Sequence, residues 1–122
     1  METYGPAPIQ ARCGSNQHHC ADSNLADTMT CASLTSILTQ NRRGGIDPNV
    51  RVVLHYNNEG GTCVISWHDH VPNMVNGYLV TAANKVLWSC GVSQTRVSGY
   101  ATDVSLNGVC TTQCLSSARN CS

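Results

Sequence analysis

The residues whose types and spacing come closest to a chemical site are Trp67-His68-Asp69-His70. Two histidines beside a carboxylate could bind zinc or copper, and a His–Asp pair could support acid–base catalysis. On an extended segment, however, His68 and His70 would point to one side and Asp69 to the other. A metal would then need further ligands, for which the chain offers only His18, His19 and His55. We therefore favour a polar loop following a strand, and we predict no metal and no cofactor.

Enzyme signatures are absent from the sequence. It contains no Gly-x-Ser-x-Gly, His-Glu-x-x-His or phosphate-binding glycine loop. The glutamates are Glu2 and Glu59, in an expected tail and turn, which argues against the paired carboxylates of glycosidases. A small ribonuclease could in principle use Glu59, His55 and His68 with an arginine, but their spacing does not favour it. We expect a protein that is not an enzyme.

Eight cysteines in 122 residues predict a disulfide framework. Disulfides persist in oxidising compartments, so we expect a secreted, extracellular protein. Cysteine as a metal ligand is disfavoured, because Cys110 and Cys114 have no second close pair to complete four ligands. Eight cysteines allow 105 pairings, and the sequence does not choose among them. The cysteines expected in disulfides are Cys13, Cys20, Cys31, Cys63, Cys90, Cys110, Cys114 and Cys121.

Length and charge limit the remaining possibilities. We expect one domain over residues 13–122, preceded by an extended arm over residues 1–12 with two prolines. Seven basic residues balance seven acidic ones, which argues against nucleic acid or an anionic membrane as the main partner. No apolar stretch approaches the ~20 residues of a membrane span. No signal peptide is visible, so we expect a mature form with an added initiator Met.

The apolar spacing predicts two helices. The first begins at Asp27 or Thr28, either of which can cap it, and carries Cys31, Leu34, Ile37 and Leu38 at helical spacing. The second begins near Gly77 and ends at Gly91. We expect Trp67 and Trp88 to anchor the core, because each lies on the apolar side of its element.

Two hairpins are expected to form the sheet. Residues 50–56 and 62–67 alternate as strands about a Gly-rich turn, and Asn107-Gly108 predicts a type I′ turn between strands 101–106 and 109–115. A further strand is expected over residues 92–98, and Cys13 to Cys20 is expected to be a polar loop. The predicted fold class is therefore α+β: an antiparallel sheet of about four strands with two helices packed on it, held by disulfides.

One half of the chain resembles a group of known proteins. The segments Gly61-Thr-Cys-Val-Ile-Ser-Trp67, Val86-Leu-Trp-Ser-Cys90 and Asp103–Ser117 resemble small secreted cysteine-rich effector proteins of filamentous fungi. The hairpin–helix–hairpin layout over residues 61–117 is also similar to fungal killer-toxin-like and necrosis-inducing effector domains. The opening and closing motifs of the toxin family are missing here, so the resemblance carries no toxin activity.

The resemblance implies a monomeric secreted fungal protein that binds a host extracellular protein, most simply by inhibiting a plant papain-like cysteine protease and so suppressing immunity. A disulfide-linked loop suits that role because it loses little entropy on docking. Candidate loops are His68–Asn76 and Arg42–Asn49, stiffened by Pro72 and Pro48. The candidate binding residues are His68, Asp69, His70, Pro72, Asn73, Arg42 and Arg43. Alternatives are an antimicrobial protein of the killer-toxin type and an extracellular ribonuclease.

Overall fold

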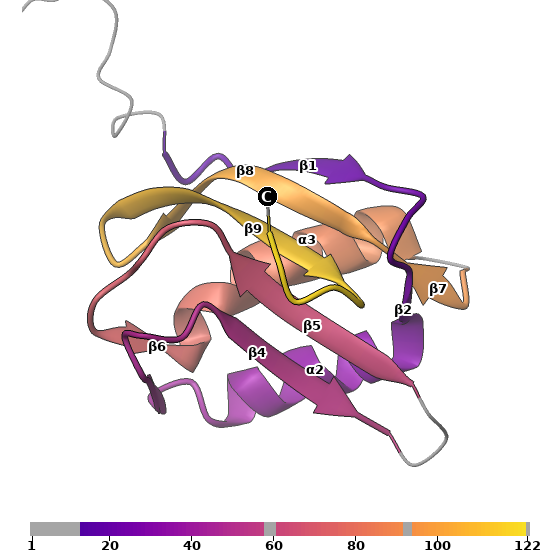
Figure 1. Cartoon of the computed structure of the whole chain (residues 1–122), viewed down its shortest axis with the longest axis horizontal. Coiled ribbons are helices and arrows are strands. Elements are labelled where there is room, and N and C mark those ends of the chain that lie inside the picture. Colours follow the sequence, from indigo (N-terminus) through magenta and orange to yellow (C-terminus); the bar gives the residue numbers. More distant parts are fainter. Residues whose placement is uncertain (1–12, 58–60, 92–93, 122) are drawn as a thin grey trace, which may run out of the picture.

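An antiparallel sheet and two helices make up the fold in the computed structural model, which describes residues 13–57, 61–91 and 94–121 (Figure 1). The main sheet has the strand order β1-β8-β9-β5-β4, and all its neighbours are antiparallel. The predicted α+β class is confirmed, but the sheet has five strands instead of about four. The predicted arm over residues 1–12 lies outside the described residues.

The additional strand is β1, Gln17–Cys20, in the segment predicted to be a polar loop. It pairs with β8, Gly99–Leu106, at the edge of the sheet. All four of its residues are exposed, so the strand has no alternation of apolar and polar side chains that could have revealed it. Backbone pairing and the Cys20–Cys90 disulfide hold it in place.

The two predicted hairpins form the rest of the sheet. Strand β4 (Val52–Tyr56) pairs with β5 (Thr62–Trp67), and β8 pairs with β9 (Val109–Ser116). Asn107 and Gly108 have φ angles of 49° and 85°, as the predicted type I′ turn requires. Of the strand predicted over residues 92–98, residues 92–93 lie outside the described residues. The described remainder contains only the short strand β7 (Arg96–Val97), which pairs with β2 (Ala26–Asp27).

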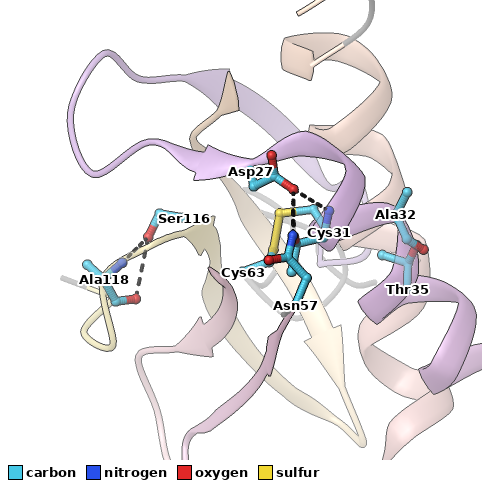
Figure 2. The surroundings of a disulfide bond; sticks show 9 residues. Asp27, Cys31, Ala32, Thr35, Asn57, Cys63, Ser116 and Ala118 are labelled. Carbon is cyan, nitrogen blue, oxygen red and sulfur yellow. Dashed lines mark hydrogen bonds between the residues drawn. A yellow bond between two sulfur atoms is a disulfide. The ribbon is translucent and has the colours of Figure 1, made fainter. Parts of the chain in front are cut away.

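Helix α2 spans Thr28–Gln40, and its N-cap is Asp27, one of the two residues predicted to cap it. Its first turn lies beside the β4–β5 hairpin, where the Cys31–Cys63 disulfide joins helix to strand (Figure 2). Helix α3 spans Val80–Gly91 and follows a 3-10 turn, η1 (Asn76–Leu79). The short strands β3 (Gly45–Ile46) and β6 (Met74–Val75) pair between the two halves of the chain.

The core lies between the helices and one face of the sheet (Figure 1). Trp67 is 2% exposed within it, as predicted. The prediction for Trp88 was wrong, because this side chain is 67% exposed. It follows Lys85 by three residues and Thr81 by seven, so it lies on the solvent face of α3 with these two exposed residues.

All eight cysteines lie in the described residues and form four disulfides, as predicted: Cys13–Cys110, Cys20–Cys90, Cys31–Cys63 and Cys114–Cys121. Two of them join a helix to a strand. Cys110 and Cys114, both on β9, are bonded to the segment before β1 and to the C-terminal segment, respectively.

The sheet face away from the helices is partly covered by the C-terminal segment, residues 117–121. Cross-strand register places Val52, Ser66 and Cys114 in one row on this face. The Cys114–Cys121 disulfide folds the segment back over that row, and Figure 1 shows it in yellow in front of β9 and β5. Ser66 and Val64 on this face are buried.

No helix among the described residues is both long and apolar enough to span a bilayer.

Candidate binding site

The chain leaves β5 through residues 68–73, here called the 68–73 loop, and its backbone is held at several points. The His68 amide donates to the Thr112 carbonyl at 3.0 Å, and the Asp69 amide donates to Thr111 Oγ1 at 3.0 Å. At the other end, Asn107 Nδ2 donates to the Pro72 carbonyl at 2.9 Å. The loop is therefore hydrogen-bonded to β9 and to the turn that precedes it.

The side chains of the 68–73 loop are divided between core and solvent. Val71 is 2% exposed and packs into the core. His68, His70, Pro72 and Asn73 are exposed, and Asp69 is half-buried. Asn73 has a φ of 54°, a left-handed conformation that asparagine tolerates better than most residues. One buried anchor and several backbone bonds thus hold a row of solvent-facing side chains.

The extended geometry assumed for His68-Asp69-His70 was wrong, because the chain bends directly after Trp67. The bend brings His68 Nδ1 to 3.4 Å from Asp69 Oδ1, with both side chains about half exposed. Within the described part of the chain, no third His, Cys, Asp or Glu joins a group able to hold a metal ion.

An open groove of about 670 Å³ begins at this bend. Three segments line it: residues 49–52, residues 67–70 and residues 119–121. They come from the start of β4, the end of β5 and the C-terminal segment, so sheet pairing and the Cys114–Cys121 disulfide together form the groove. Of the predicted binding residues, His68, Asp69 and His70 lie in its wall.

Two arginines in the wall of the groove, Arg51 and Arg119, were not among the predicted binding residues. Arg51 Nη1 donates to the His68 carbonyl at 2.8 Å, which joins the start of β4 to the bend. Arg119 Nη2 donates to the Tyr56 hydroxyl at 2.8 Å, which holds the C-terminal segment over β4. The only sequence feature of Arg51 is its nearness to Arg42 and Arg43, with which it forms a small basic cluster around a glycine-rich turn. Nothing marked Arg119, since its position depends on a disulfide pairing that the sequence leaves open.

The other predicted binding residues lie apart from the groove. Arg42 and Arg43 line a separate depression of about 450 Å³ with residues of η1 and α3. The predicted loop Arg42–Asn49 is interrupted by β3, which pairs with β6. Pro72 and Asn73 are in the 68–73 loop but not in the wall of the groove. The predicted binding residues are therefore divided between two surfaces. The 68–73 loop with its groove is the better defined of the two.

A scan against protein-family models matched residues 5–122 to the family described as fungal WD-like. The chain belongs to the fungal WD-like family. The match covers nearly all of the chain and supports the fungal origin that the sequence resemblance implied. Searches of curated proteins and of solved structures found no match.

Proposed function

We propose that this fungal WD-like protein is a secreted binding protein that docks on its target through the 68–73 loop. The observation that carries the proposal is the combination of a fixed backbone with exposed His68, His70, Pro72 and Asn73. A loop ordered before binding loses less conformational entropy on docking, so more of its contact free energy becomes affinity. The four disulfides support an extracellular role, since such bonds persist in oxidising compartments.

As the target we propose a papain-like cysteine protease of a plant host. The resemblance to fungal effectors suggests this class, and two features of the chain agree with it. Pro72 restricts the backbone, which disfavours cleavage at that point, and four disulfides keep the chain folded in a protease-rich medium. The protein would act by blocking a protease that the plant secretes for defence.

An inhibition assay tests both parts of the proposal. The disulfide-bonded protein is titrated against papain and against a papain-like protease from plant extracellular fluid, with a small peptide substrate as the readout. We expect inhibition by the native chain and about tenfold or greater weakening in the triple variant His68→Ala, Pro72→Ala, Asn73→Ala, since central interface residues often contribute more than about 1 kcal/mol each. The matched control is Arg42→Ala with Arg43→Ala, which should inhibit as the native chain does.

Each alternative result has a definite meaning. No inhibition by the native chain would overturn the protease as target, and equal inhibition by the triple variant would overturn the loop as the docking surface. Growth inhibition of fungi or bacteria, or degradation of RNA, at concentrations that leave the protease active would support the antimicrobial or ribonuclease alternative.

A further inference from the structure

The groove beside the 68–73 loop has an excess of positive charge. Its charged side chains are Arg51, Arg119 and Asp69, with His68 and His70 beside them. With both histidines counted as neutral, the two arginines and one aspartate leave a net positive charge among the groove side chains. Asp69 lies beside His68 Nδ1, and neither arginine forms an ion pair with a carboxylate of the described residues. The chain as a whole has balanced charge, so this excess is local.

Both guanidinium groups are held in place while most of their donors stay available. Arg51 uses Nη1 for the His68 carbonyl, and Arg119 uses Nη2 for the Tyr56 hydroxyl. A guanidinium has five N–H donors in a planar fork that matches a carboxylate in a two-point bond. Because one bond already orients each fork, an incoming carboxylate would order little that is not ordered already.

The remaining groove residues suit a peptide better than an acidic sugar chain. Asn49 and Asn120 carry amide groups that can both donate to and accept from a peptide backbone. Residues 49–52 lead into β4, which is the last strand at its edge of the main sheet, where an extended peptide can align. Sugar rings favour the exposed face of a Trp or Tyr ring, but Trp67, the one such residue in the groove wall, is 2% exposed.

We propose that the groove binds an acidic peptide segment, with Arg51 and Arg119 each receiving a carboxylate from Asp or Glu side chains. This inference rests on the proposed binding function and adds the chemistry of the partner: the target carries an acidic stretch next to the surface that meets the 68–73 loop. Docking would then combine the exposed loop with charge pairing in the groove.

A titration of the isolated protein tests this inference without any protease. A short peptide of alternating Glu and Ser is the probe, a matched peptide of Gln and Ser is the control ligand, and amide NMR shifts are the readout. We expect the Glu peptide to shift the amides of residues 49–52, 68–70 and 119–121, and the Gln peptide to leave them unchanged. Added salt should weaken the binding, because the groove is open to solvent.

Variants identify the residues responsible. Arg51→Gln and Arg119→Gln should each lower the affinity for the Glu peptide by about tenfold. This is the loss expected when one partner of a charge-assisted hydrogen bond is removed. Arg51→Lys keeps the charge but not the fork, so it should recover only part of the affinity. Arg96→Gln is the control, because this exposed arginine lines a different depression. Retained amide spectra elsewhere show that each variant is folded.

The results separate this inference from the proposed function. Equal binding of the Glu and Gln peptides, or full affinity in both arginine variants, would overturn the groove assignment even if the protease is inhibited. Tighter binding of a polyuronate of the same charge would overturn the assignment to a peptide. Peptide binding without protease inhibition would leave this inference standing and overturn the protease as target.

Discussion

At the scale of single residues, Asp27 connects the start of α2 to the sheet. Its Oδ2 accepts from the Thr30 amide at 2.9 Å and from the Thr30 hydroxyl at 2.6 Å. Asn57 Nδ2 donates to Thr30 Oγ1 at 2.8 Å and to Asp27 Oδ2 at 3.5 Å, so the network reaches the β4–β5 hairpin. Figure 2 shows the bond between Asp27 and Asn57. The two hydrogen bonds that Asp27 accepts from Thr30 lower the pKa of Asp27, and the positive charge of Arg96 lowers it further. Burial of the carboxyl acts in the opposite direction.

The lowered pKa predicts a pH-dependent contribution of Asp27 to stability. A carboxyl whose folded pKa is below its unfolded value stabilises the fold above the unfolded pKa, and this stabilisation is lost as pH falls through the folded pKa. We expect Asp27→Ala to reduce the free energy of unfolding by about 1 kcal/mol at neutral pH. Below about pH 4, the difference in free energy of unfolding between Asp27→Ala and the native chain should become smaller.

Urea unfolding of both proteins across the acid range measures this effect. Asp27→Asn is the control, because it keeps an N-cap acceptor without a titrating group, so its stability should be closer to that of the native chain at neutral pH. If Asp27→Ala loses as much free energy of unfolding in acid as at neutral pH, the carboxylate charge does not contribute to stability.

Gly61 provides a second prediction at this scale. A Cβ at this position would lie 2.7 Å from Thr30 Oγ1 and would also meet the Asn57 side chain. Because the Gly61 amide donates to Asn57 Oδ1 at 2.6 Å, the clash falls on the same network that Asp27 joins. We expect Gly61→Ala to lower the free energy of unfolding by about 1–3 kcal/mol in chemical denaturation. Gly45→Ala, where a Cβ meets nothing within 4 Å, should have little effect.

Some residue roles can be predicted from neighbouring residues in the sequence, and others depend on contacts between distant segments. Asp27 was predicted as an N-cap because its type and its place before an apolar repeat are local signals. The need for glycine at position 61 was not predictable, since it comes from the approach of Thr30, which is 31 positions earlier in the chain. Trp88 was wrongly assigned to the core, because its helix carries apolar residues on more than one side.

At the scale of elements, the 68–73 loop depends on the turn between β8 and β9. Asn107 contributes to the turn and to the loop. Its backbone adopts a φ of 49°, and its side-chain Nδ2 donates a hydrogen bond to the Pro72 carbonyl. The turn was predictable from Asn107-Gly108, but its contact with the loop was not, because the two segments are 35 residues apart. The same limit hid β1, whose exposed residues carry no periodic signal.

Replacing Asn107 with glycine tests this contact. Asn107→Gly keeps the backbone freedom that the turn needs but removes the bond to Pro72. We expect faster amide hydrogen exchange in residues 70–73 and weaker target binding, with a loss of stability of at most about 1 kcal/mol. Asn16→Gly is a matched control, since Asn16 has a similar φ of 51° outside the loop. Unchanged exchange in the loop of Asn107→Gly would mean that other contacts hold it.

At the scale of the whole molecule, the four disulfides have different roles. Cys31–Cys63 joins α2 to β5 inside the core across 32 positions of sequence. Cys114–Cys121 spans only 7 positions, yet it places Arg119 in the groove. The sequence predicted that all eight cysteines are paired, but with 105 possible pairings it could not place the C-terminal segment on the sheet. The sequence could therefore not predict the groove, although His68, Asp69 and His70 in its wall were among the predicted binding residues.

Removing these two disulfides separately distinguishes stability from binding. In the loop-entropy model, their loss costs about 3.7 kcal/mol for Cys31–Cys63 and about 2.5 kcal/mol for Cys114–Cys121. We expect Cys114→Ser with Cys121→Ser to unfold at a higher denaturant concentration than Cys31→Ala with Cys63→Ala, but to lose the Glu-peptide affinity. Full peptide affinity without the Cys114–Cys121 bond would show that the C-terminal segment is not part of the site.

The central claim is that the 68–73 loop and the adjoining groove form the binding surface. Hydrogen exchange of the disulfide-bonded protein, free and in complex with a plant papain-like protease, tests it most directly. We predict slower exchange on binding in residues 68–73, 49–52 and 119–121, with no change around Arg42, Arg43 and Trp88. Absence of a complex, or protection confined to those outlying residues, would contradict the account.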